Sequence, residues 1–94
     1  MAERMRYLKE ALVRIGYKCT SSRRRDMTAY FVTRAQNGIK FGIGARNGNI
    51  YIVRFSEIDH PKNGTETIAS PNSNAENIAL FVELLARCAM LRTA

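Results

Sequence analysis

The sequence predicts an α+β fold: an antiparallel meander sheet of three to five strands, with an N-terminal and a C-terminal helix packed on one of its faces. Apolar residues recur at helical spacing near both ends of the chain, which predicts the two helices. Between them, two Asn-Gly pairs separate three runs rich in β-branched and aromatic residues, which predicts the meander. A chain of 94 residues buries only one core, so residues 1–94 are expected to form a single small basic domain.

The first predicted helix has an apolar face made by Met5, Leu8, Leu12 and Ile15, at the spacing that brings side chains to one side of a helix. Gly16 follows and is expected to end the helix as a left-handed C-cap. The stretch YKCTSSRRRD comes next, and its run of arginines is expected in an exposed loop. Whether residues 17–20 form a short edge strand stays open.

The predicted meander occupies the middle of the chain, in the runs MTAYFVTR, IKFGIGAR and NIYIVRFSEI. Asn-Gly between such runs favours hairpins, because both residues accept positive φ. The stretch DHPKNG is expected to be a loop, and residues 65–69 are left open as a further strand. Ser73 and Glu76 then have the spacing of a capping box, which predicts the start of the last helix.

The last predicted helix is apolar on two sides, so it has two surfaces to bury. One side contains Ile78, Leu85 and their neighbours. The second contains Leu80, Leu84 and Leu91. Two alternatives account for this second stripe: it packs against the first helix, or it forms the interface of a homodimer.

The run IKFGIGAR raises a question, because glycine weakens a strand and this run contains two. Side chains alternate along a strand, so Ile39, Phe41, Ile43 and Ala45 share one face, which is expected to be core. The opposite face carries Lys40, Gly42, Gly44 and Arg46. The glycines therefore lie on the face turned away from the helices.

The pairing of this strand with the next depends on the turn between them. A type I turn with Gly48 as the left-handed bulge residue pairs Ile43 with Tyr51. A two-residue turn would instead place Arg54 beside Phe41 on the core face, so the bulged turn is preferred. The same reasoning at the first turn directs Met27, Ala29 and Phe31 to the core.

This register predicts a trough on the outward face of the sheet, with glycines as its floor, apolar walls and basic ends. Its residues are Tyr30, Val32, Arg34, Lys40, Gly42, Gly44, Arg46, Ile50, Ile52 and Arg54. A floor without side chains permits the close approach of a ligand. In the alternative interpretation, Tyr30 folds over the glycines and fills the gap.

The formal net charge of +7 is unevenly distributed along the chain. Residues 1–56 contain twelve Lys or Arg and three acids, whereas residues 57–94 contain three bases and five acids. Arg outnumbers Lys by about three to one, and Arg is the side chain best shaped to hold phosphates and carboxylates. The sequence therefore favours a polyanionic or acidic partner.

The cysteine and hydropathy patterns indicate the cellular environment in which the protein is expected. Two cysteines, Cys19 and Cys88, are too few and too distant for a disulfide scaffold or a zinc motif, which favours a reduced, cytoplasmic setting. No apolar run approaches the ~20 residues of a transmembrane helix, so no membrane contact is expected.

Catalytic motifs are not found in the sequence. The one histidine, His60, has no serine, cysteine or second histidine at a catalytic spacing, and the acids are too scattered for a metal site. No glycine-rich phosphate loop connects a strand to a helix. We therefore expect a protein that is not an enzyme and that requires no cofactor or metal.

The order of helix, three-stranded meander and helix is similar to that of double-stranded-RNA-binding domains. Those domains carry lysines at the start of the second helix, whereas SPNSNAEN contains none, so the chain is not assigned to that family.

Two functional hypotheses follow from the basic outward face. The first is a non-enzymatic nucleic-acid-binding protein, DNA-binding or RNA-binding, possessing a basic sheet face and an arginine-rich loop. Its expected contact residues are Arg23, Arg24, Arg25, Tyr30, Arg34, Lys40, Gly42, Gly44, Arg46 and Arg54. The alternative is a small inhibitor or adaptor of the phage or plasmid type, which places the same face on an acidic or nucleic-acid-binding protein.

Overall fold

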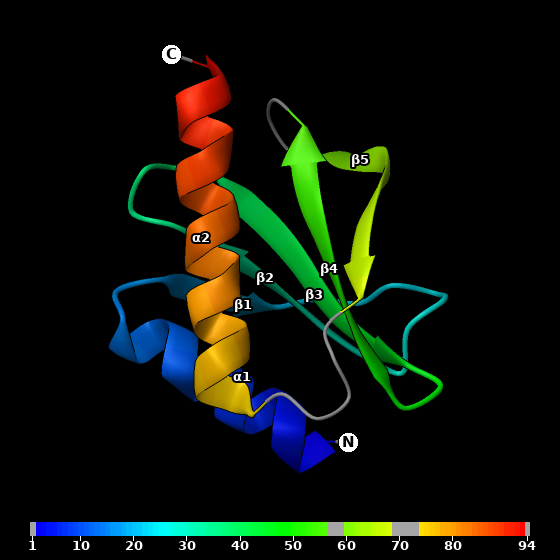
Figure 1. The fold of residues 1–94 in the computed structure, drawn as a ribbon. Coiled ribbons are helices and arrows are strands. Elements are labelled where there is room, and N and C mark those ends of the chain that lie inside the picture. Colours follow the sequence, from blue (N-terminus) through cyan, green and yellow to red (C-terminus); the bar gives the residue numbers. More distant parts are fainter. Residues whose placement is uncertain (1, 57–59, 69–73, 94) are drawn as a thin grey trace.

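The computed structural model describes the backbone of residues 2–56, 60–68 and 74–93 and the side chains of residues 3–55 and 74–88. The elements of this part of the chain are α1 (Ala2–Arg14), β1 (Lys18–Ser21), β2 (Ala29–Arg34), β3 (Lys40–Arg46), β4 (Asn49–Ser56), β5 (His60–Ile68) and α2 (Ala75–Thr93). Both helices pack on one side of a single sheet (Figure 1). The predicted α+β fold is therefore confirmed.

The strands form one antiparallel sheet in the order β1-β2-β3-β4-β5, so each strand pairs with its neighbours in the sequence. The two segments left open by the sequence are both strands. The loop predicted at DHPKNG is wrong from His60 onward, because β5 begins there and pairs with β4. Asp59 lies outside the described residues. The sheet is thus a five-stranded meander.

The end of α1 confirms the expected role of Gly16, whose φ is 98°. The Gly16 N–H donates to the carbonyl of Val13 at 3.0 Å, and the Tyr17 N–H donates to the carbonyl of Leu12 at 3.0 Å. These two bonds make a Schellman motif, which satisfies carbonyls that the helix leaves without partners.

At the start of α2, Asn74 provides the cap. Its side-chain oxygen accepts from the Asn77 N–H at 2.8 Å, and its carbonyl accepts from the Ile78 N–H at 3.1 Å. The capping box was predicted one residue earlier, at Ser73, which lies outside the described residues. Asn serves this position as well as Ser does, because both side chains accept from the first turn of the helix.

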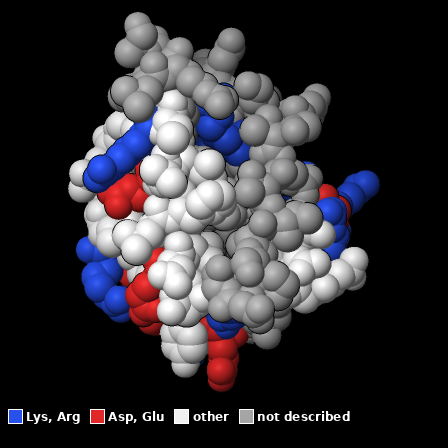
Figure 2. All heavy atoms as spheres, viewed as in Figure 1, with Lys and Arg blue, Asp and Glu red and all other residues white. Residues whose placement is uncertain are grey.

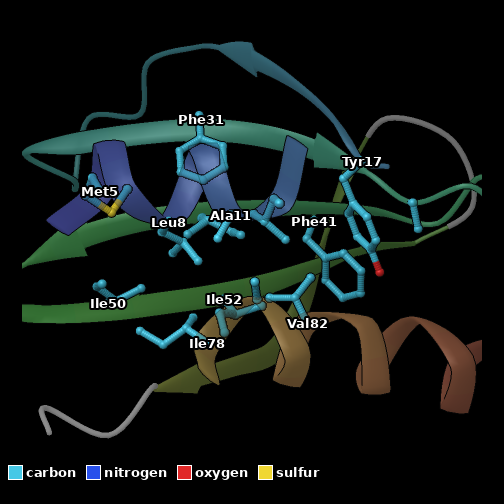
Figure 3. Packing of buried hydrophobic residues seen from close by; sticks show 14 of the residues in the cluster. Met5, Leu8, Ala11, Tyr17, Phe31, Phe41, Ile50, Ile52, Ile78 and Val82 are labelled. Atoms are coloured by element: carbon cyan, nitrogen blue, oxygen red, sulfur yellow. The ribbon is translucent and has the colours of Figure 1, made fainter. Parts of the chain in front are cut away.

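The core lies between the sheet and the two helices (Figure 3). α1 contributes Leu8 and Leu12, α2 contributes Ile78 and Val82, and all four are 0–1% exposed. The sheet supplies Phe31, Phe41, Ile43, Ala45, Ile50 and Ile52. Burying one such Leu or Ile side chain stabilises the fold by about 1.5–3 kcal/mol.

The hairpin of β3 and β4 differs from the prediction by one residue. Asn47 and Gly48 both have positive φ, 51° and 79°, as in a two-residue type I′ turn, and Arg46 pairs with Asn49. Such a turn matches the twist of the strands, which favours it over the bulged turn. The expected pairing of Ile43 with Tyr51 is wrong, since Ile43 pairs with Ile52.

The new register exchanges the two faces of β4. Ile50 and Ile52, predicted as walls of the outward trough, lie in the core with 0% and 1% exposure. Arg54 pairs with Phe41 and so lies on the helix side, not on the outward face. The sheet accepts Arg54 there because its position is only partly buried, near the end of the strand.

The loop that precedes β2 contains a second correction. Met27 was expected in the core, but its side chain lies beside Gly44, on the other side of the sheet. Ala29 and Phe31, predicted with it, do face the core. The alternation that places those two begins only at Ala29, where β2 starts, and it therefore does not extend back to Met27.

Candidate nucleic-acid interface on the outer face of the sheet

The outer face is the side of the sheet turned away from α1 and α2. Residues that pair across antiparallel strands point to the same side, so the register arranges this face in rows. One end carries Lys18, Arg34 and Lys40, which we call the basic row. The middle carries Thr20, Val32, Gly42 and Val53, then Tyr30, Gly44 and Tyr51.

The basic row crosses three neighbouring strands. Lys18 of β1 pairs with Arg34 of β2, and Arg34 pairs with Lys40 of β3. Lys18 and Arg34 also line one hollow of about 290 Å³ at this end of the sheet. Like charges directly opposite one another destabilise a sheet, so this row has an energetic cost.

The glycines of β3 make room for Tyr30. A Cβ placed on Gly42 would lie 2.8 Å from Cζ of the Tyr30 ring, and one on Gly44 would lie 3.1 Å from its Cδ1. A Cβ on Gly44 would also meet Met27 at 2.8 Å. The open floor predicted for the trough is therefore covered by the tyrosine, as the alternative interpretation had it.

Tyr30 is held in this place by Arg24. Burial raises the pKa of the Tyr30 hydroxyl above its usual value, while the charge of Arg24 and a hydrogen bond from it act in the opposite direction. The Tyr30 side chain is partly exposed, and one side of its ring rests on the glycine backbone of β3.

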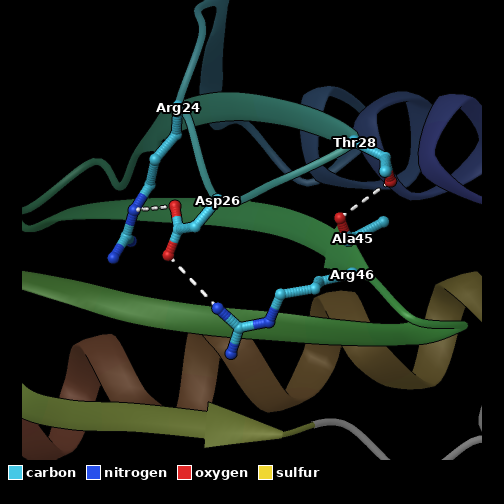
Figure 4. A network of polar contacts seen from close by, with 5 residues as sticks. All are labelled: Arg24, Asp26, Thr28, Ala45 and Arg46. Atoms are coloured by element: carbon cyan, nitrogen blue, oxygen red, sulfur yellow. Dashed lines mark hydrogen bonds and ion pairs between the residues drawn. The ribbon is translucent and has the colours of Figure 1, made fainter.

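Beyond Tyr30 lies the arginine clamp, which we define as Arg24, Asp26 and Arg46. Nε of Arg24 lies 2.8 Å from Oδ1 of Asp26, and Nη1 of Arg46 lies 3.2 Å from Oδ2 of the same carboxylate. The two guanidinium groups approach from opposite sides, with the helices behind the strands (Figure 4). The clamp fastens the loop 22–28 over the sheet.

The same loop is anchored to the backbone of β3. Both the N–H and the hydroxyl of Thr28 donate to the carbonyl of Ala45, at 2.8 and 2.9 Å (Figure 4). Arg46, which follows Ala45, places its guanidinium 4.4 Å from the centroid of the Tyr51 ring. This cation–π contact brings a second aromatic side chain into the outer face.

The structure brings together most of the predicted contact residues. Tyr30, Gly42 and Gly44 lie in the middle of the outer face. The other predicted residues of this face lie toward its two ends. Arg24 and Arg46 belong to the clamp at one end, and Arg34 and Lys40 to the basic row at the other. Arg23 and Arg25 are exposed on the loop. Arg54 is not part of the face.

Among the residues of the outer face that the sequence reasoning missed, one is charged, Lys18, and one is aromatic, Tyr51. Lys18 was missed because β1 was left open as a strand. Tyr51 was missed because the turn at Asn47 and Gly48 was taken to be bulged. Asn-Gly itself was the available signal, since it is the preferred pair of a type I′ turn.

On the helix side, α2 presents an apolar stripe to solvent. Leu80 and Leu84 are each 56% exposed, and Phe81 is 37% exposed. α1 packs beside α2, yet it does not cover these leucines, so the first alternative for this stripe is wrong for the two of them. The side chain of Leu91 lies outside the described residues. Figure 2 shows an uncharged strip over α2 with charged groups around it.

The described part of the chain was also compared with what a metal site, a membrane span or a disulfide would need. Within residues 3–55 and 74–88, no three His, Cys, Asp or Glu side chains gather where they would hold a metal ion. Neither helix, over its described length, is long and apolar enough to cross a membrane. Cys19 and Cys88 are both free thiols. The side chain of His60 lies outside the described residues.

The outer face is therefore a part of the described surface where cations, aromatic rings and accessible hollows meet. Comparisons of this chain with protein-family models, with curated proteins and with solved structures find no significant match.

Proposed function

We propose that this protein is a non-enzymatic nucleic-acid-binding protein of the cell interior that binds through the outer face of its sheet. The observation that carries the proposal is the basic row, in which Lys18, Arg34 and Lys40 stand opposite one another across three strands. Three like charges in one row reduce the stability of the sheet. A bound polyanion relieves the repulsion among these three cations. Each phosphate that the row neutralises also releases counterions, which adds to the affinity.

Aromatic side chains support a nucleic acid over a simple anion. Tyr30 and Tyr51 are both partly exposed and flank Gly44 on the two neighbouring strands. Base stacking on such rings contributes about 1–3 kcal/mol per base and tolerates any sequence. A single strand, whose bases are free to stack, is therefore the form that this surface suits best.

An acidic protein is the second candidate partner, and the arginine clamp is the observation that favours it. Arg24 and Arg46 already hold one carboxylate, that of Asp26, so the face accepts this chemical group. A carboxylate-rich surface would bind the basic row in the same manner. It would not use the faces of Tyr30 and Tyr51, which is why nucleic acid is the first proposal.

A titration at two salt concentrations tests the proposal. Labelled 12-nucleotide DNA and RNA, single and double stranded, are titrated with wild-type protein and with two double variants of equal charge. Lys18→Gln with Arg34→Gln removes two cations of the basic row. Arg6→Gln with Arg14→Gln removes two from α1, on the other side of the sheet.

We expect the basic-row variant to bind more weakly and with a smaller salt slope, reduced by about 0.7 per lost contact on single strands. The α1 variant should bind within about twofold of wild type, since screening weakens charges far from the ligand. Equal losses in both variants would mean that only net charge matters. Binding to polyglutamate, without binding to any polynucleotide at low salt, would reject the proposal in favour of an acidic protein.

We also propose that α2 joins two copies of the chain. Leu80 and Leu84 form an exposed apolar stripe, and Glu76 and Arg87 lie on the same side of the helix, one before and one after the two leucines. Nη2 of Arg87 also lies 3.5 Å from Oε1 of Glu83 on its own helix, an exposed pair that an interface charge would compete with. An antiparallel copy that sets Leu80 against the partner's Leu84 brings Glu76 beside the partner's Arg87. Opposite charges then meet at both ends of the contact, which fits a symmetric dimer.

A further inference from the structure

The arginine clamp has the form of an anion-binding site that is occupied by a side chain of the protein itself, the carboxylate of Asp26. Asp26 gives one oxygen to each arginine, Oδ1 to Nε of Arg24 and Oδ2 to Nη1 of Arg46. Arg24 lies on the loop 22–28 and Arg46 is the last residue of β3, and the two converge on this one carboxylate (Figure 4). Two guanidinium groups around one carboxylate make a site with the charge and shape for an oxyanion.

Asp26 satisfies this site only in part. Nη1 of Arg24 is buried and has no hydrogen-bond partner among the described residues. A guanidinium presents its N–H groups as a fork that binds two oxygens at once. A phosphodiester has two free oxygens and carries the same single negative charge as a carboxylate. It would fit between the same two arginines and accept hydrogen bonds from either guanidinium group.

The contacts within the clamp are weak enough to exchange. The side chains of Arg24, Asp26 and Arg46 are 28%, 42% and 34% exposed, so water and ligands reach all three. Ion pairs at this exposure contribute about 0–1 kcal/mol. The Met27 N–H donates to the carbonyl of Arg24 at 3.1 Å and Thr28 is anchored to β3, so the backbone at Asp26 stays in place and the carboxylate leaves by rotation of its side chain.

A hollow beside the clamp gives a ligand room. It has a volume of about 270 Å³, and Arg23, Arg24, Thr28 and Tyr30 are among the residues that line it. This volume exceeds that of a phosphate group several times over. A strand that follows the loop could therefore place one phosphate at the clamp and the adjoining sugar in the hollow.

We propose that Asp26 is an internal mimic of a backbone phosphate, which a nucleic-acid phosphate displaces on binding. The proposal rests on the proposed function, since it names how that ligand enters the outer face. In the free protein Arg46 lies on the ring of Tyr51 and is held by Asp26. A phosphate that takes the place of the carboxylate is bound by Arg46 from the same position, beside the Tyr51 ring.

The test is the substitution Asp26→Asn, which keeps the size of the side chain and removes its charge. The matched control is Glu10→Gln, which makes the same change of net charge on the exposed surface of α1. Binding of a labelled 12-nucleotide single strand is measured by fluorescence anisotropy at 50 and 200 mM salt, and polyglutamate is titrated in parallel. Thermal unfolding checks that each variant is folded.

We expect Asp26→Asn to bind the single strand about fivefold more tightly than wild type at 50 mM salt, because the competing carboxylate is gone. Glu10→Gln should stay within about twofold of wild type. If Asp26→Asn does not fold, Asp26→Ser repeats the loss of charge with a residue that suits loops.

Three results would overturn the proposal. Equal tightening in both variants would show an effect of net charge alone. Unchanged or weaker binding by Asp26→Asn, with wild type binding normally, would show that the carboxylate only fastens the loop. Tightening toward polyglutamate and not toward the single strand would assign the site to carboxylates. If no form of the protein binds any polynucleotide, the proposed function fails as well, so the two failures are distinct.

Discussion

At the scale of single residues, the two glycines of β3 are explained by the side chains packed on them: Tyr30 over Gly42, and Tyr30 with Met27 over Gly44. Gly42 and Gly44 lie beneath Tyr30, and neither has a positive φ, so the backbone at both positions would accept other residues. What excludes a side chain is the Tyr30 ring at Gly42, and that ring together with the Met27 side chain at Gly44. The same ring lies in the middle of the outer face, and the glycines leave the space that it fills over β3.

A double-mutant cycle tests this role. Gly42→Ala should destabilise the protein by about 1–3 kcal/mol, because its Cβ would force the Tyr30 ring away. In a Tyr30→Ala background the same substitution should cost much less, since the space above Gly42 is then empty. Unfolding in urea measures both values. Equal costs in the two backgrounds would show that strand propensity, not the ring, selects glycine at this position.

At the scale of elements, sequence reasoning located each helix and the central hairpins, but it did not determine which turn joins β3 to β4. The helices were predictable because Met5, Leu8 and Leu12 repeat at helical spacing, and Gly16 ends the first helix at the expected residue. The β4 pattern NIYIVRF is apolar on both faces, so periodicity alone does not say which side is buried.

The same ambiguity limited the candidate site. The residues of β2 and β3 were placed on the correct face, because Ile43 alternates with glycines along β3 and Phe31 of β2 pairs with Ile43. The residues of β4 were placed on the wrong one. Tertiary packing decided the matter, since the type I′ turn buries Ile50 and Ile52 beneath the helices.

The exposed stripe of α2 makes a prediction about oligomeric state. Wild-type protein should dimerise reversibly, and Leu84→Gln should shift it to monomer in analytical ultracentrifugation with little loss of stability, because Leu84 is 56% exposed. Val13→Gln is the control, since Val13 is 55% exposed on α1 and lies outside the stripe. The patch is small, so we expect dissociation in the micromolar range or above.

The antiparallel arrangement is tested by reversing charges. Glu76→Arg should weaken the dimer, and adding Arg87→Glu should restore it, because each swapped residue then meets its opposite in the partner. A monomeric wild type at millimolar concentration would contradict the dimer. Failure of the double variant to recover would contradict the antiparallel register.

At the scale of the whole molecule, the two sides of the sheet carry different kinds of residue. The helix side holds the core and the apolar stripe of α2, whereas the outer face collects the basic row, Tyr30, Tyr51 and the arginine clamp. Stability and binding are expected to oppose one another on the outer face.

Arg34 allows this opposition to be measured. Arg34→Thr should raise the melting temperature at low salt by a few degrees, because it removes the middle charge of the basic row, at a position where Thr suits a strand. The gain should shrink in 1 M salt. Arg25→Thr, on the exposed loop, is the matched control. A lower melting temperature for Arg34→Thr at low salt would refute the cost assigned to the row.

The length of the β3–β4 turn, rather than the identity of the turn residues, determines which side chains of β4 face solvent. Because side chains alternate, inserting one residue after Gly48 would present Ile50 and Ile52 to solvent and drive Tyr51 and Val53 into the core, with no other change in the sequence. The hairpin should therefore tolerate substitutions in the turn far better than insertions. Among distant relatives, the length of this turn would be a more reliable mark of shared binding than the residues that bind.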